Sequence, residues 1–205
     1  MDVESPFQAE QLNVHVVSQI STRFVHRQAS LEPIVELIAR QFEQRPGNYL
    51  AFFSSFDYLQ QVAQLLAERH PHVTQWSQGR RMDEAARQGF LDQFTLSGQG
   101  VGFAVLGGAF GEGIDLPGAR LIGAFVATLG LAQFNPVNEQ IKQRMAALFG
   151  AGYDYTYLYP GVQKVVQAAG RVIRTQSDQG TLFLIDDRFA EPKVQQLLPR
   201  WWQLG

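Results

Sequence analysis

Short apolar runs alternate with longer amphipathic stretches along most of the chain. Runs of this kind are typical of buried strands, and apolar residues at a spacing of three and four are typical of helices. The predicted strands are 13–17, 49–53, 73–76, 101–106, 121–127 and 181–185. The predicted helices are 31–44, 57–69, 83–94, 161–174 and 193–198. Strands that alternate with helices favour parallel pairing, so we expect an α/β three-layer sandwich in which helices cover both faces of a mostly parallel sheet.

Length and composition favour one globular domain that spans residues 1–205. A chain of 205 residues with 45% hydrophobic and 18% charged residues can bury one sizeable core. No internal repeat, low-complexity tract or linker interrupts it. The formal net charge is −2, so any contact with nucleic acid must come from a local basic surface.

The residue inventory excludes several kinds of site and location. The chain has no cysteine, which excludes a disulfide, a thiolate zinc site and a cysteine-held iron–sulfur cluster within it. Its four histidines are scattered without metal-ligand spacing, so we predict no metal site. Neither a membrane-spanning apolar stretch nor a signal region is present, and we expect a soluble cytoplasmic protein without membrane contacts.

A glycine-rich segment, residues 107–118, follows the predicted strand 101–106. Glycine lets backbone approach a ligand closely, and the segment places Glu112 and Asp115 in a constrained loop. The alternative is an ordinary glycine-rich turn. A dinucleotide-binding fingerprint is a second functional interpretation, but it should open a long helix after its third glycine. Here Pro117 and Gly118 intervene before another strand, which disfavours this fingerprint.

Two arginines near the last predicted strand suggest a phosphate-binding role. In the predicted helix 161–174, a spacing of three places Arg171 and Arg174 on one helical face with Gln167. Guanidinium groups stay charged and match phosphate oxygens with a planar fork of donors. A solvated or salt-bridged helix face is the alternative.

The sequence Gln167-x-x-Gly170-Arg171-x-x-Arg174 resembles motif VI of superfamily 2 helicases, and residues 107–118 resemble motif V. Together with Asp186-Asp187-Arg188-Phe189, these phrases resemble the DinG/XPD branch of DNA helicases from residue 49 onward. The resemblance implies a RecA-like second motor domain, with a P-loop NTPase-like fold but no P-loop of its own. It implies that Arg171 and Arg174 act in ATP hydrolysis. The other implied nucleotide contacts are Gln167, Gly170, Glu112, Gly113 and Asp115.

The same resemblance implies a track for single-stranded DNA. Residues 53–56 resemble motif IV, and residues 78–81 resemble the Gln-Gly turn of this branch. The implied DNA contacts are Ser54, Ser55, Gln78 and Gly108. A helix N-cap is the alternative role for Ser54, Ser55 and Asp57, and capping is compatible with a DNA contact. Solvation is the alternative for the arginines at 80 and 81. The tyrosines at 153, 155, 157 and 159 either stack on bases or pack against the protein.

The ATP-anchoring half of such a helicase is not encoded in these residues, because no Gly-x-x-x-x-Gly-Lys-Ser/Thr sequence occurs. We therefore expect a fragment of a longer helicase whose first motor domain holds ATP and Mg²⁺ and, by resemblance, an iron–sulfur cluster. The resemblance also implies 5′-to-3′ movement and a place in DNA repair. We expect the chain alone to be inactive. The alternative is a non-catalytic nucleic-acid or protein-binding module with the same RecA-like fold.

Overall fold

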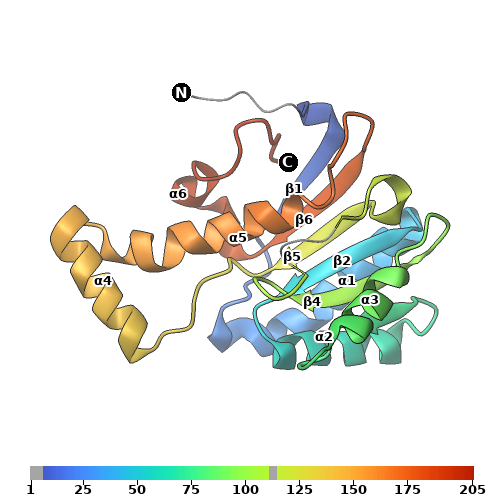
Figure 1. The fold of residues 1–205 in the computed structure, drawn as a ribbon, viewed down its shortest axis with the longest axis horizontal. Helices are drawn as coiled ribbons and strands as arrows, with labels where there is room; N and C mark the ends of the chain where they lie inside the picture. Colours follow the sequence, from blue (N-terminus) through green and yellow to red (C-terminus); the bar gives the residue numbers. More distant parts are fainter. Residues whose placement is uncertain (1–6, 111–114) are drawn as a thin grey trace.

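The computed structural model describes residues 7–110 and 115–205, and its centre is a six-stranded sheet (Figure 1). The strands lie in the order β1-β6-β5-β2-β4-β3, and every pair is parallel. Their bounds are Leu12–Val17 (β1), Asn48–Phe53 (β2), Gln75–Ser77 (β3), Gly100–Val105 (β4), Gly123–Ala127 (β5) and Gly180–Ile185 (β6). The predicted parallel sheet is confirmed, and all six predicted strands are present.

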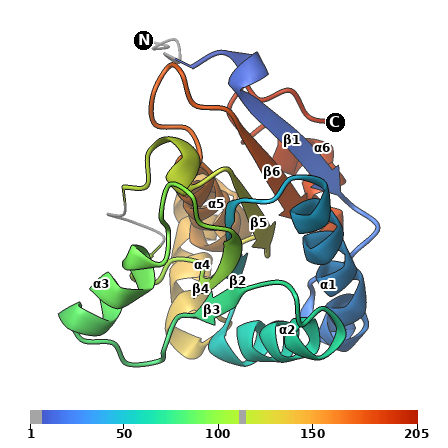
Figure 2. The same ribbon diagram turned by 90° about the vertical axis from the view of Figure 1, so that its right-hand side faces the viewer.

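Helices cover both faces of the sheet (Figure 2), which confirms the three-layer prediction. One face packs against α1 (Arg27–Gln44) and α2 (Phe56–Arg69). The other packs against residues of α3 (Glu84–Asp92), α5 (Tyr159–Ala169) and α6 (Pro192–Gln195). Successive side chains of a strand point to opposite faces, so a strand between two helical layers is apolar at every position. In β2, all six residues are buried.

A helix that the apolar pattern did not predict, α4 (Pro136–Phe149), projects away from the sheet (Figure 1). Its N-cap is Asn135, whose side chain accepts a hydrogen bond from the Asn138 backbone at 2.8 Å. None of its residues is buried. A short π-helix, η4 (Asp154–Leu158), follows and runs directly into α5. Because α4 packs no apolar face against the core, it leaves no amphipathic signature of the usual kind.

The prediction of one helix over 161–174 is wrong at its C-terminal end. Helix α5 ends at Ala169, and the backbone N–H of Arg171 bonds to the Ala168 carbonyl at 3.1 Å in a turn. Val172 and Ile173 are both 2% exposed. The Val172 backbone N–H also bonds only three residues back, to Ala169, and the Arg174 N–H bonds to the Asp178 side chain, so helical hydrogen bonding does not continue beyond Gly170. Arg171 and Arg174 therefore do not share a helical face with Gln167.

Short 3₁₀ segments complete the fold at Ala9–Gln11 (η1), Phe24–His26 (η2), Gly118–Arg120 (η3) and Asp187–Ala190 (η5). Leu204 forms a parallel bridge with Val14, and so the end of the chain lies along the outer side of β1. Within the described ranges, no helix combines the length and apolar character needed to cross a membrane.

Candidate functional site

A groove lies where several parallel strands end. It has a volume of about 380 Å³ and is lined by residues that follow β1, β2, β5 and β6. The lining consists of Thr22, Arg23, Phe24, Val25, Arg27, Ser54, Thr128, Leu131, Phe134, Tyr153 and Arg188. Three arginines and three aromatic side chains are among them. Ligands of parallel α/β sheets bind at this edge, where the carboxyl ends of strands meet.

Arg27 connects the start of α1 to the loop after β2. Its Nη2 donates a hydrogen bond to Ser54 Oγ at 2.9 Å, and its guanidinium lies 4.7 Å from the ring centroid of Tyr58. Ser55 caps α2, because its hydroxyl accepts a hydrogen bond from the Tyr58 backbone at 3.3 Å. The N-cap alternative is therefore confirmed for Ser55. Ser54 faces the groove instead.

Arg188 lines the groove and forms a buried ion pair with Asp186. Asp186 is fully buried, and its two carboxylate oxygens accept from Arg188 Nε at 2.6 Å and Nη2 at 2.9 Å. The backbone N–H and hydroxyl of Thr22 also donate to this carboxylate. Burial acts to raise the pKa of Asp186, but these hydrogen bonds and the Arg188 charge hold it below its ordinary value.

Gln78 and Gly108 lie together beyond the end of β4. Gln78 Oε1 accepts a hydrogen bond from the Val105 backbone at 2.9 Å. A Cβ on Gly108 would lie 3.4 Å from Gln78 Nε2 and 3.0 Å from the Val105 carbonyl. Gly107 turns the chain here with φ of +75°, a conformation that other residues rarely adopt. Both predicted contacts are thus at the carboxyl end of the sheet but outside the lining of the groove.

A second polar cluster lies before the amino ends of β5 and β6. Arg174 Nε is 3.5 Å from Asp115 Oδ1, and their side chains are 30% and 76% exposed. The loop is fixed by Asp178, whose Oδ2 accepts from the backbone of Arg174 at 2.7 Å and of Thr175 at 2.8 Å. Burial acts to raise the pKa of Asp178, but these hydrogen bonds and one from the Gly118 backbone hold it below its ordinary value. The segments that resemble motifs V and VI therefore meet.

The other predicted nucleotide contacts are close to Asp115 or Arg174 in sequence. Gln167 lies on α5 and Arg171 follows it, and both are half-buried. Gly170 is exposed and has φ of −63°, and a Cβ there would meet only the carbonyls of Val166 and Gln167 at 3.4 Å. The fold itself therefore accommodates a side chain at Gly170. Glu112 and Gly113 lie outside the described residues.

Tyr153 and Tyr157, at the start of η4 and within it, differ in burial. Tyr157 is fully buried, stacks on Phe134 with ring centroids 4.7 Å apart, and donates to Glu139 at 2.7 Å. Tyr153 is 43% exposed and lines the groove. Packing against the protein is therefore confirmed for Tyr157, and base stacking by Tyr153 stays a prediction.

The groove contains residues that sequence reasoning missed. Arg23, Phe24 and Arg27 precede or begin α1, which the apolar pattern began only at residue 31. Phe134 and Thr128 follow β5. Two arginines beside an aromatic residue were an available signal in the sequence, because grooves that bind single-stranded nucleic acid combine cations with aromatic rings.

A family model described as the helicase C-terminal domain matches residues 38–205, which include β2 to β6, the Asp115–Arg174 cluster and the part of the groove lining that follows β2. The chain belongs to the helicase C-terminal domain family. The match starts inside α1 and includes the last residue, so it covers well over half of the chain.

Several curated relatives of this helicase domain are ATP-dependent DNA helicases. The chain is 28% identical to chl1 of Neosartorya fischeri over 76% of this chain and 22% of the relative. It is 24% identical to chl1 of Schizosaccharomyces pombe over 94% of this chain and 26% of the relative. The chain thus spans about a quarter of the length of these two proteins.

Solved structures show the same RecA-like fold for this helicase domain. An apo XPD structure aligns with a TM-score of 0.77 at 14% identity, over 95% of this chain and 40% of that chain. Domain 2 of the DEAD-box helicase Mss116p, bound to an RNA duplex, aligns with a TM-score of 0.53 at 14% identity, over 85% of this chain and 54% of that chain. The predicted fold and family are confirmed.

Proposed function

We propose that residues 1–205 form the second motor domain of an ATP-dependent DNA helicase of the DinG/XPD type, with 5′-to-3′ movement along single-stranded DNA. One observation carries the proposal. A groove lined by arginines and aromatic rings lies at the carboxyl end of the sheet, and the Asp115–Arg174 cluster lies before the amino ends of β5 and β6. A motor domain needs one surface for the strand and another for the nucleotide.

The groove has the two chemical features that bind single strands without reading sequence. Cations follow the phosphates, and aromatic rings accept the face of any base. Arg27 and Ser54 can donate to phosphate oxygens, and the rings of Phe24, Phe134 and Tyr153 stand 83%, 66% and 43% exposed. Ser55, Gln78 and Gly108 lie outside the lining of the groove, and in this proposal they form the adjoining part of the DNA track.

The second cluster fits the phosphates of ATP. A first motor domain, in the same protein, would hold the nucleotide and Mg²⁺, and ATP-driven closure would bring Arg171 and Arg174 against the transferring phosphate. Asp115 orients Arg174, and exposed Gly170 leaves room for the nucleotide beside Gln167. Glu112 and Gly113 belong to the same proposed site. An iron–sulfur cluster would belong to the first motor domain, because this chain has no cysteine.

Replacing Arg27 by alanine should weaken binding of the chain to a fluorescent oligothymidylate roughly 10-fold, because one charge-assisted phosphate contact is lost. The slope of log K against log salt should fall by about 0.7. Fluorescence anisotropy over a salt series measures both. Arg40→Ala is the matched control, because Arg40 is an exposed arginine on α1 outside the groove. Equal losses of DNA affinity in the two variants would show that the groove is not the DNA-binding surface.

The chain alone should not hydrolyse ATP, even with single-stranded DNA present. Arginines stabilise the transferring charge, but the sequence has no phosphate-binding loop to hold the β- and γ-phosphates. Turnover of the purified chain is compared with that of an Arg171→Lys, Arg174→Lys double variant. Turnover clearly above the double variant would contradict the division of labour between two motor domains.

A further inference from the structure

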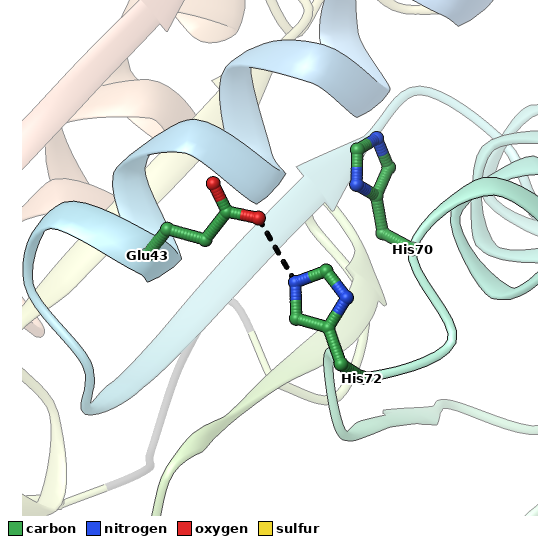
Figure 3. Close-up of side chains that lie close together, drawn as sticks. All are labelled: Glu43, His70 and His72. Carbon is green, nitrogen blue, oxygen red and sulfur yellow. Dashed lines mark hydrogen bonds and ion pairs between the residues drawn. The ribbon is translucent and has the colours of Figure 1, made fainter.

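Glu43, His70 and His72 lie close together although the sequence separates them. Each offers one ligand atom, and these atoms lie within 4.8 Å of one another. Glu43 belongs to the last turn of α1, and the two histidines belong to the loop that follows α2 (Figure 3). His72 Nε2 is 2.9 Å from Glu43 Oε1. We propose that these three residues form a binding site for a divalent transition metal, with Zn²⁺ as the metal that fits best.

The ligand set suits zinc. Imidazole nitrogens and a carboxylate oxygen bind Zn²⁺ at about 2.0–2.2 Å in tetrahedral geometry, which leaves the fourth position for water. The side chains of His72 and Glu43 are 53% and 55% exposed, so they can move the short distance that closure around an ion requires.

The local structure already orients His70. Its side chain is only 18% exposed, and its Nε2 lies 3.1 Å from Glu36 Oε1 on α1. Figure 3 shows the other ring nitrogen turned toward Glu43 and His72. A carboxylate that accepts from one imidazole nitrogen fixes the tautomer in which the other nitrogen is free to bind a metal. Glu36 is therefore the outer carboxylate of the site. Arg69 lies 3.9 Å from the same oxygen and balances its charge.

The backbone holds the two histidines at a fixed spacing. The N–H of His70 bonds to the Leu66 carbonyl at 2.8 Å, and its carbonyl accepts from Val73 at 3.0 Å. Pro71 between the histidines has a fixed φ. Because α1 leads into the amino end of β2, the site lies away from the groove at the carboxyl end. A metal there would join the end of α1 to the loop after α2, independently of the proposed DNA contacts.

Calorimetric titration of the tag-free chain with ZnCl₂ tests the proposal. We expect one zinc ion per chain, and at 100 times the dissociation constant the melting temperature should rise by about 5–10 °C. Glu36→Gln should weaken zinc binding roughly 10–100-fold, as for other outer carboxylates. Glu43→Gln and His72→Asn remove ligands and should weaken it further. His26→Asn removes an exposed imidazole elsewhere and should bind zinc as the unchanged chain does.

The proposal is overturned if the unchanged chain shows no saturable zinc binding, or if Glu43→Gln and His72→Asn bind as tightly as it does. Equal weakening by His26→Asn would also overturn it, because binding would then be a general property of surface histidines. Both ligand variants alter exposed side chains, so each should fold, and the melting temperature without zinc verifies this.

Discussion

Replacing Arg174 by lysine in an enzyme that contains both motor domains should lower DNA-stimulated ATP turnover by about 10³-fold, the contribution expected of an arginine finger. Lysine keeps the charge but loses the planar fork that binds two phosphate oxygens at once. An interaction made mainly in the transition state lowers kcat and leaves ATP binding nearly unchanged. Steady-state kinetics and nucleotide binding are measured together.

The structure explains why the Arg174 variant should still fold. The loop is fixed by Asp178 through the backbone N–H of Arg174, which a lysine retains. The Asp115 partner of Arg174 is 76% exposed and lies at 3.5 Å, so this ion pair contributes at most about 1 kcal/mol. Arg171→Lys should act in the same direction as Arg174→Lys.

Arg40→Lys is the matched control for these kinetics, because Arg40 is an exposed arginine of α1, outside both polar sites. Near-normal ATP turnover of both Arg171→Lys and Arg174→Lys would refute the proposed role of these residues as arginine fingers. The two arginines would then only form ion pairs at the protein surface. Equal loss in Arg40→Lys would point to a general effect of the substitution.

The central sheet could be predicted from sequence because a parallel sheet between two helical layers is apolar on both faces. β2 and β6, with every residue buried, follow this rule, and short apolar runs locate them within a residue or two. β3 is less regular, since its residues are half-buried or exposed at the edge of the sheet. Its prediction at 73–76 is displaced from the observed Gln75–Ser77.

Helix α4 was missed because the pattern of apolar residues detects only helices that pack on a core. Asn135 as N-cap, Pro136 in the first turn and Gly150 at φ of +73° were the available signals. The end of α5 was missed for a related reason. Arginines at a spacing of three fit a helical face, but the Arg174 backbone N–H bonds to the Asp178 side chain instead of continuing the helix, and the apolar pattern does not report that contact.

The sites depend on contacts between distant segments, and local sequence patterns do not report these. Asp115 and Arg174 resemble known motifs, which is how the sequence identified them, but only the fold brings them within 3.5 Å. Glu43 meets His72 only because α1 and α2 pack side by side on one face of the sheet. The four histidines therefore gave no metal signal in sequence.

Replacing Asp186 by asparagine should destabilise the chain by about 3–5 kcal/mol, because it leaves Arg188 buried without a carboxylate partner. The Arg188 side chain is only 14% exposed, and Thr22 would also lose its acceptor at Oδ2. In a chain of 205 residues this loss lowers the melting temperature by roughly 10 °C. Calorimetry or urea unfolding near neutral pH measures it.

Asp187→Asn is the matched control for this stability measurement, because Asp187 is the next residue in the chain and also pairs with an arginine. Its bond to Arg23 Nε is 3.1 Å long, but the two side chains are 38% and 42% exposed. Exposed pairs contribute about 0–1 kcal/mol, so this variant should remain close to the unchanged chain. Equal destabilisation by the two substitutions would show that burial of Asp186 is not the cause.

The acid dependence of stability provides an independent check on Asp186. Its pKa in the folded chain lies below the ordinary value, so the unfolded chain takes up the proton first as pH falls. The stabilisation is fully present above the unfolded pKa of about 3.9 and is lost as pH falls from there through the folded pKa. Asp186→Asn should therefore show a shallower loss of unfolding free energy below about pH 4 than the unchanged chain. Identical slopes in that range would mean that the carboxylate of Asp186 does not carry the stabilisation assigned to it.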